Sequence, residues 1–167
     1  VLVPGGFGTR GSEGIIDTAT YALEKNIPYL GICFGFQLAA IAFGRKMCNL
    51  KNANSTEIVA DTKNPVIDLL PEQKQETDMG GSLRLGANEI KINQDSLAYK
   101  IYNSDKIFKR HRHRYEFNTK YREEFLKNGM IFSGESDNGK RMEILLELYI
   151  LYASESWLIL ISFAPNR

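Results

Sequence analysis

The sequence has 167 residues, enough for one domain with a sizeable core, and 43% of them are hydrophobic. Its 21 basic and 20 acidic residues give a net charge of +1, so charge alone indicates neither a nucleic-acid partner nor a membrane surface. The two cysteines lack the dense spacing of a disulfide scaffold, and no signal peptide precedes them, so we expect free thiols in a cytoplasmic protein. Cys48 is expected to be a small core residue. Residues 145–163 come closest to a membrane span, but Glu147 and Glu155 interrupt them.

The first third of the chain alternates between short apolar runs and helical patterns. A β-branched run at 1–3 predicts a buried strand, and the glycine-rich loop that follows extends to Gly14. Helical spacing of apolar residues predicts helices over 15–25 and 34–48, with a second buried strand at 29–33 between them. This order is typical of a parallel α/β sheet. A complete strand signal at residue 1 also indicates a piece of a longer protein.

The remainder is polar and rich in turns as far as residue 94, which favours short strands and loops over helices. We expect a short helix at 96–102, an exposed basic stretch at 108–118 that ends in a strand, and a helix at 121–128 stopped by Gly129. Strands at 130–133 and 141–148 are expected to flank a turn at 136–139. No internal repeat or linker divides the chain, so a single domain over 1–167 is predicted.

Cys33 lies between Gly31 and Gly35, where the second predicted strand meets the following helix. This is the form of a nucleophile elbow, a tight turn that projects a side chain at the edge of a sheet. The helix N-terminus is expected to lower the pKa of the thiol, and the N–H of Phe34, with a donor from the glycine loop, would stabilise an oxyanion. The alternative is a buried structural cysteine whose glycines serve packing. The glycine loop after the neighbouring strand favours the nucleophile.

Six segments resemble, in order, motifs of the glutaminase domains of CTP synthases, which are class I (triad-type) glutamine amidotransferases. These segments are VLVPGGFGTRGSEG, IPYLGICFGFQLA, NANSTE, MGGSLRLGA, RHRHRYEFN and FSGESDNGKRMEI, and the resemblance covers residues 1 to about 148. It implies an α/β fold, a doubly wound and mostly parallel sheet with the elbow at its edge. It also implies hydrolysis of glutamine to glutamate and ammonia, which a separate synthetase domain uses to aminate ATP-activated UTP, a ligase reaction of pyrimidine biosynthesis.

The resemblance assigns roles to individual residues. Cys33 would attack the glutamine amide and form a glutamyl thioester. Glu57 would hold the α-amino group and Arg114 the α-carboxylate, which suits their opposite charges. Further substrate-contacting positions are Gly6, Phe34, Gly35, Phe36 and Gln37. Ser82 and Arg84 match, more weakly, positions at which GTP acts as an allosteric activator.

The same resemblance implies no cofactor and no metal in this domain, because ATP and Mg²⁺ belong to the synthetase domain. The expected partners are L-glutamine, the synthetase domain on the same chain and, in the full-length protein, further copies in a homo-oligomer. Neither a nucleic acid nor a membrane is expected.

The C-terminal end departs from the family pattern. The family carries Gln-Phe-His-Pro-Glu-Phe there, which supplies the general base and the carboxylate that orients it. This chain has SFAPNR, which puts Ala164 in place of the histidine and Asn166 in place of the glutamate. Its only histidines, His111 and His113, lie in the basic motif and are not expected to replace the base. We therefore expect glutamine hydrolysis to be very slow or absent.

Several alternatives stay open. The loss after Ile144 is abrupt, which favours a shifted reading frame, a sequencing artefact or a decaying gene over gradual loss of function. A catalytically inactive glutamine- or GTP-binding regulatory domain of the same fold is the main alternative function. A different cysteine hydrolase, such as a γ-glutamyl peptidase, is another, although Glu57 and Arg114 favour free glutamine.

Overall fold

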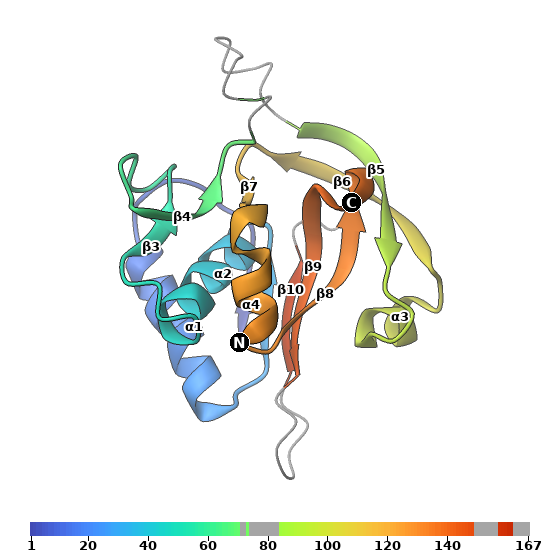
Figure 1. The fold of residues 1–167 in the computed structure, drawn as a ribbon, viewed down its shortest axis with the longest axis horizontal. Helices are drawn as coiled ribbons and strands as arrows, with labels where there is room; N and C mark the ends of the chain where they lie inside the picture. Colours follow the sequence, from blue (N-terminus) through green and yellow to red (C-terminus); the bar gives the residue numbers. More distant parts are fainter. Residues whose placement is uncertain (71–72, 74–83, 149–156, 162–167) are drawn as a thin grey trace.

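The structure, a computed structural model, describes residues 1–70, 73, 84–148 and 157–161. A seven-stranded sheet forms its centre, and a three-stranded sheet lies beside it (Figure 1). The large sheet has, in spatial order, β1 (Leu2–Val3), β2 (Tyr29–Ile32), β10 (Trp157–Ile161), β9 (Arg141–Leu148), β8 (Met130–Ser136), β5 (Arg84–Ile92) and β6 (Lys106–His113). The small sheet has β3 (Ala53–Ser55), β4 (Asn64–Asp68) and β7 (Glu116–Phe117).

Parallel pairing is confined to one end of the large sheet. There β2 runs parallel to both β1 and β10, whereas the other four pairings are antiparallel. The expected α/β fold is confirmed, but the expectation of a mostly parallel sheet is wrong for the described strands. The strand–helix–strand rhythm that favours parallel pairing ends at residue 48. Later strands such as β8 and β9 are joined by a short turn, which permits only antiparallel neighbours.

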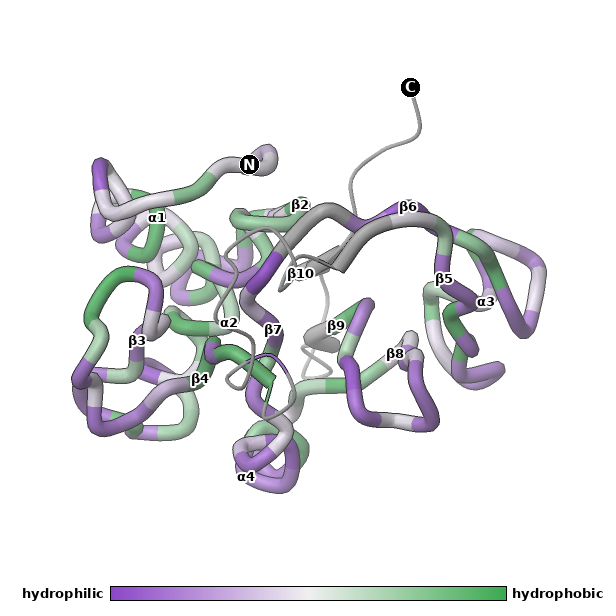
Figure 2. The backbone as a smooth tube through the Cα atoms, turned by 90° about the horizontal axis from the view of Figure 1, so that it is seen from above, coloured by the Kyte–Doolittle hydropathy of each residue, from purple (hydrophilic) through white to green (hydrophobic). Residues whose placement is uncertain are grey.

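Four helices cover this framework: α1 (Ser12–Lys25), α2 (Phe34–Lys46), α3 (Leu97–Tyr102) and α4 (Arg122–Lys127). The described residues also form the 3₁₀ turns η2 (Thr119–Tyr121) and η3 (Asp137–Gly139). Seen from above, α1, α2 and the small sheet lie on one side of the central strands, and the β5–β6 hairpin with α3 lies on the other (Figure 2). None of the helices in the described part of the chain is long and apolar enough to cross a membrane.

The core is built around α2, which is buried on nearly all sides. Residues 34–44 are all buried, because the helix lies between the sheet, α1 and the small sheet. At its C-terminal half, Phe43 packs on Phe125 of α4 with ring centroids 5.0 Å apart, and Phe125 meets Phe117 of β7 at 4.9 Å. A second, smaller cluster surrounds α3. These aromatic contacts fix the small sheet and α4 against the helix that follows Cys33.

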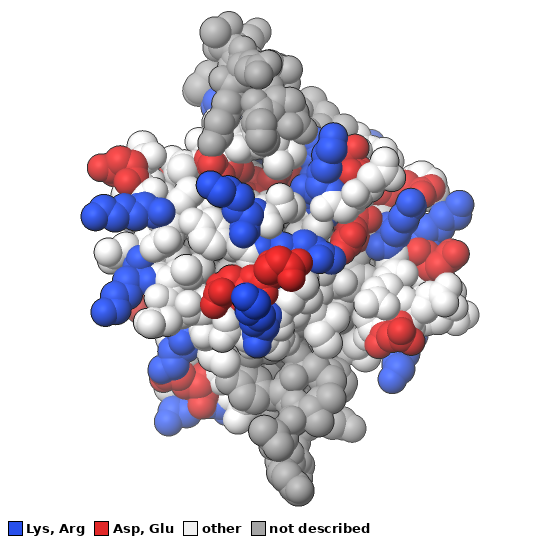
Figure 3. All heavy atoms as spheres, viewed as in Figure 1, with Lys and Arg blue, Asp and Glu red and all other residues white. Residues whose placement is uncertain are grey.

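The predicted helices at 34–48, 96–102 and 121–128 and the strands at 29–33, 130–133 and 141–148 are confirmed within a few residues. The basic stretch differs from the expectation of an exposed segment that ends in a strand. The strand already begins at Lys106, and the side chain of His111 within it is buried, with 2% exposure. On the face seen in Figure 3, Lys and Arg side chains lie interspersed with Asp and Glu, as the balanced composition predicts.

The register brings the carboxyl ends of the parallel strands together. Val3 of β1 pairs with Gly31, and Ile161 of β10 pairs with Ile32 of β2. The glycine loop leaves the sheet after β1, and Cys33 follows β2, so both emerge at one edge. In open α/β sheets this edge is where ligands bind.

Candidate active site

Cys33 sits in a strained turn between β2 and α2. Its φ of 54° and ψ of −105° lie outside the regions that ordinary side chains favour. A Cβ at Gly31 would lie 2.6 Å from the carbonyl oxygen of Gly35, and a Cβ at Gly35 would lie 2.3 Å from that of Val3. Only glycine fits at either position. The predicted nucleophile elbow is therefore present.

The environment of the Cys33 thiol differs from the expectation in one respect. Burial raises the pKa of the thiol, and the nearby Glu116 and Glu57 carboxylates raise the pKa further, while the backbone N–H of Phe34 lowers it. The net pKa is raised, so the expectation of a lowered thiol pKa is wrong. The helix end acts as predicted, but desolvation outweighs it.

The glycine loop packs directly against the elbow. A Cβ at Gly5 would lie 3.6 Å from the Cβ of Cys33, and one at Gly6 would lie 3.3 Å from Cδ1 of Phe34. The loop therefore runs beside the thiol, where backbone N–H groups can meet a developing oxyanion.

Glu57 is held to the same loop from the small sheet. It follows β3, and its Oε1 accepts a hydrogen bond from the N–H of Gly8 at 3.0 Å. Its own N–H donates to the hydroxyl of Ser55 at 3.1 Å. The contact brings Glu57 to the Cys33 edge, 49 residues from the glycine that it binds.

The segment after β6 approaches from the other direction. Gln37 Nε2 of α2 donates to the carbonyl of Tyr115 at 2.8 Å, which ties the segment to the elbow helix. The guanidinium of Arg114 lies 5.9 Å from the Tyr115 ring centroid, and the carboxylate of Glu116 is 2% exposed. Arg114 and Glu116 thus flank Tyr115, the residue that Gln37 binds one turn after the nucleophile.

Five other positions from the sequence analysis do not contribute to the described site. Phe36 is 1% exposed and belongs to the core, so its side chain is not available to a substrate. Arg84 is described only as the first residue of β5. Ser82, Ala164 and Asn166 lie outside the described residues.

His111 takes part in a buried polar chain. Its Nε2 lies 2.9 Å from Oε2 of Glu143, and its Nδ1 lies 3.4 Å from Nδ2 of Asn88. Because Nδ2 of Asn88 is a donor, the proton belongs on Nε2, which donates to Glu143. The hydroxyl of Ser136 donates to the other oxygen of Glu143. Both ring nitrogens contact partners within the sheet, so the ring links β6 to β9 and is not available as a base for Cys33.

Sequence reasoning did not single out Glu116, Arg141 or Glu143. Arg141 Nε lies 3.6 Å from Oε1 of Glu116, and Arg141 Nη1 lies 2.8 Å from Oδ2 of Asp137. Nothing in the spacing indicates their partners, which lie up to 32 residues away.

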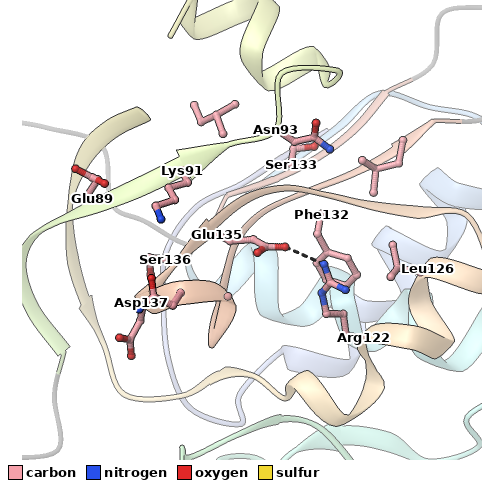
Figure 4. Close-up of a pocket in the computed structure, with 14 residues that line it drawn as sticks. Glu89, Lys91, Asn93, Arg122, Leu126, Phe132, Ser133, Glu135, Ser136 and Asp137 are labelled. Atoms are coloured by element: carbon pink, nitrogen blue, oxygen red, sulfur yellow. Dashed lines mark hydrogen bonds and ion pairs between the residues drawn. The ribbon is translucent and has the colours of Figure 1, made fainter. Parts of the chain in front are cut away.

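A large cavity lies elsewhere, between α4, β5, β8 and η3. It measures about 890 Å³, and Lys91, Arg122, Phe132, Glu135 and Asp137 are among its lining residues (Figure 4). Arg122 reaches Glu135 at 2.9 Å and lies 5.3 Å from the Phe132 ring centroid. We locate the candidate site at Cys33 instead, because the strained turn and nucleophile are there.

Among the described residues no group of three or more His, Cys, Asp or Glu could hold a metal ion.

Comparison with known proteins agrees with this geometry. Residues 1–153 match the family described as Glutamine amidotransferase class-I. A CTP synthase of Archaeoglobus fulgidus is 54% identical over 86% of this chain and 27% of its own length. A CTP synthase of Desulfitobacterium hafniense is 47% identical over 99% of this chain and 30% of its own. The chain thus spans less than a third of these relatives.

A solved structure, described as the glutaminase domain of Trypanosoma brucei CTPS with bound acivicin, superposes with a TM-score of 0.86 at 33% identity. The match covers 98% of this chain and 62% of that one. With the elbow, the glycine loop and the family match over residues 1–153, the chain belongs to the class I glutamine amidotransferases.

Proposed function

We propose that this chain is the glutaminase portion of a CTP synthase, shaped to release ammonia from glutamine. The strained Cys33 turn, with Glu57 held to the adjacent glycine loop and the segment that carries Arg114 tied to α2 through Tyr115, is the observation that supports this proposal most directly. Its relatives named CTP synthase are longer chains. The same proposal includes a synthetase domain that uses ATP and Mg²⁺, and activation by GTP. It also includes a homo-oligomer of the full-length protein and a cytoplasmic location.

In the proposed reaction the sulfur of Cys33 attacks the side-chain amide carbon of glutamine. The C–N bond breaks, ammonia leaves, and a glutamyl thioester remains on Cys33 until water hydrolyses it to glutamate and the free thiol. The N–H of Phe34 and the glycine loop would stabilise the oxyanion of each tetrahedral step. Glu57 would bind the α-ammonium group and Arg114 the α-carboxylate.

Proton transfer is the weak point of this chemistry. The thiol must lose a proton and the leaving nitrogen must gain one, which a histidine normally does in turn. The sequence has Ala164 at that position, and the pKa of Cys33 is raised rather than lowered. We therefore propose hydrolysis several orders of magnitude slower than in an intact triad.

The test measures turnover and thiol labelling separately. Ammonia release from glutamine is expected to be barely detectable, whereas a diazoketone analogue of glutamine is expected to label Cys33, located by peptide mass spectrometry. The double variant Ala164→His/Asn166→Glu is expected to raise ammonia release at least about 100-fold, within the range for a restored general base. Family-like turnover by the unaltered chain, or labelling at Cys48 instead of Cys33, would contradict the proposal.

A second candidate is a regulatory domain that binds glutamine or GTP without turnover. The raised thiol pKa favours it, because the thiolate is scarce in the absence of a base. Calorimetry separates the two candidates. Glutamine binding by the unaltered chain, combined with a double variant that stays inactive, would support the regulatory domain.

A further inference from the structure

Arg141 joins two carboxylates that come from different parts of the fold. It is the first residue of β9, directly after η3, and its side chain is 18% exposed. Its Nη1 lies 2.8 Å from Asp137 in η3, and its Nε lies 3.6 Å from Glu116 in β7. One guanidinium therefore bridges the large sheet and the small sheet.

Glu116 is the more buried end of this bridge. Its side chain is 2% exposed, whereas that of Asp137 is 41% exposed and lines the large cavity, where it is labelled in Figure 4. A carboxylate buried to this extent requires a compensating cation. Arg141 places the positive charge of its guanidinium beside Glu116, and Nη1 of the same guanidinium pairs with the more exposed Asp137.

Cys33 responds to the charge of Glu116. Burial has the largest effect and raises the pKa of the thiol; among the groups of the described residues, the N–H of Phe34 lowers it, and the carboxylates of Glu116 and Glu57 raise it. Glu57 accepts a hydrogen bond from the N–H of Gly8, a neutral donor, whereas Glu116 lies beside the cationic guanidinium of Arg141.

We propose that Arg141 is a positioning residue of the Cys33 site, which pairs with Glu116 and thereby sets how much negative charge the thiol faces. This rests on the proposed role of Cys33 as the nucleophile. Arg141 acts on the thiol through Glu116, and Asp137 orients the guanidinium for that contact. The bridge also connects the rim of the large cavity to the nucleophile.

The experiment measures how fast iodoacetamide alkylates Cys33 from about pH 6 to about pH 10, read from the mass of the Cys33 peptide. Arg141→Met is expected to raise the midpoint of the pH profile, because the positive charge of Arg141 is removed from beside Glu116. Glu116→Gln is expected to lower the midpoint. Each shift is expected to reach about one pH unit, the low end for one nearby charge.

The double variant and a matched control show whether Arg141 changes the alkylation midpoint of Cys33 through Glu116. In the Glu116→Gln background, Arg141→Met is expected to leave the midpoint where Glu116→Gln alone puts it. Arg122→Met removes another ion-paired arginine, at the large cavity, and is expected to leave the midpoint unchanged. Thermal melts check that each variant is folded.

Two results would overturn the proposal. One is a midpoint that Glu116→Gln leaves unchanged or raises. This result alone overturns the proposal, even if Arg141→Met does not fold. The other is a shift by Arg141→Met that persists in the Glu116→Gln background, since Arg141 would then act on the thiol directly. Iodoacetamide needs no glutamine pocket, so failure of diazoketone labelling with intact shifts would refute the glutaminase proposal alone.

Discussion

Replacing Gly35 by alanine is expected to destabilise the fold strongly. Gly35 is the second residue of α2, and an added Cβ would lie 2.3 Å from the carbonyl oxygen of Val3 and 2.9 Å from two of its side-chain carbons. Overpacking typically costs 1–3 kcal/mol, and because this contact meets backbone in a parallel strand we expect about 3 kcal/mol. For a domain of this size that corresponds to a fall in Tm of about 6–12 °C.

Thermal unfolding followed by circular dichroism measures the effect, and Gly14 provides the matched control. Gly14 lies in the first turn of α1, and a Cβ there would meet nothing within 4 Å. Gly14→Ala is therefore expected to leave stability unchanged or raise it by up to about 1 kcal/mol through helix propensity. A Gly35→Ala protein that melts within about 2 °C of the unaltered chain would refute the steric argument for the elbow.

Three further predictions concern the core, the buried polar chain and the thiol. Phe125→Ala removes a fully buried ring from between Phe43 and Phe117, and urea unfolding is expected to show a loss of about 3–5 kcal/mol. His111→Ala leaves the buried Glu143 carboxylate without the hydrogen bond from the ring and is expected to cost about 1.5–3 kcal/mol, with His111→Leu/Glu143→Leu recovering most of it. Because the pKa of Cys33 is raised, its alkylation midpoint in the folded protein should lie at higher pH than in the urea-unfolded chain; a lower midpoint would refute this.

The sequence predicts the elbow well because its signals are local. Gly31, Cys33 and Gly35 are close in the chain, and the clash that excludes a Cβ at Gly31 involves Gly35 itself. The helical spacing after residue 34 is likewise a local pattern, so α2 is placed within two residues of its predicted end.

Longer-range features could not be predicted in the same way. Strand spacing does not say which strand pairs with which, and β10 lies between β2 and β9 although 124 residues separate Ile32 from Trp157 in sequence number. The burial of His111 depends on Glu143, a partner in another strand. The sign of the thiol pKa shift depends on desolvation and on two carboxylates that only the fold brings near Cys33.

β10 has a consequence for the order in which the protein assembles. It is the one strand of the large sheet that touches both the parallel pair β1–β2 and the antiparallel strands that begin with β9. A ribosome delivers β10 after every other described strand, and pairings between distant segments form slowly. The pairing of β2 with β10 therefore cannot form until residues 157–161 have left the exit tunnel, and until then one side of β2 lacks its partner. Sequence changes near the C-terminus thus affect the assembly of the whole sheet as well as the chemistry at Cys33.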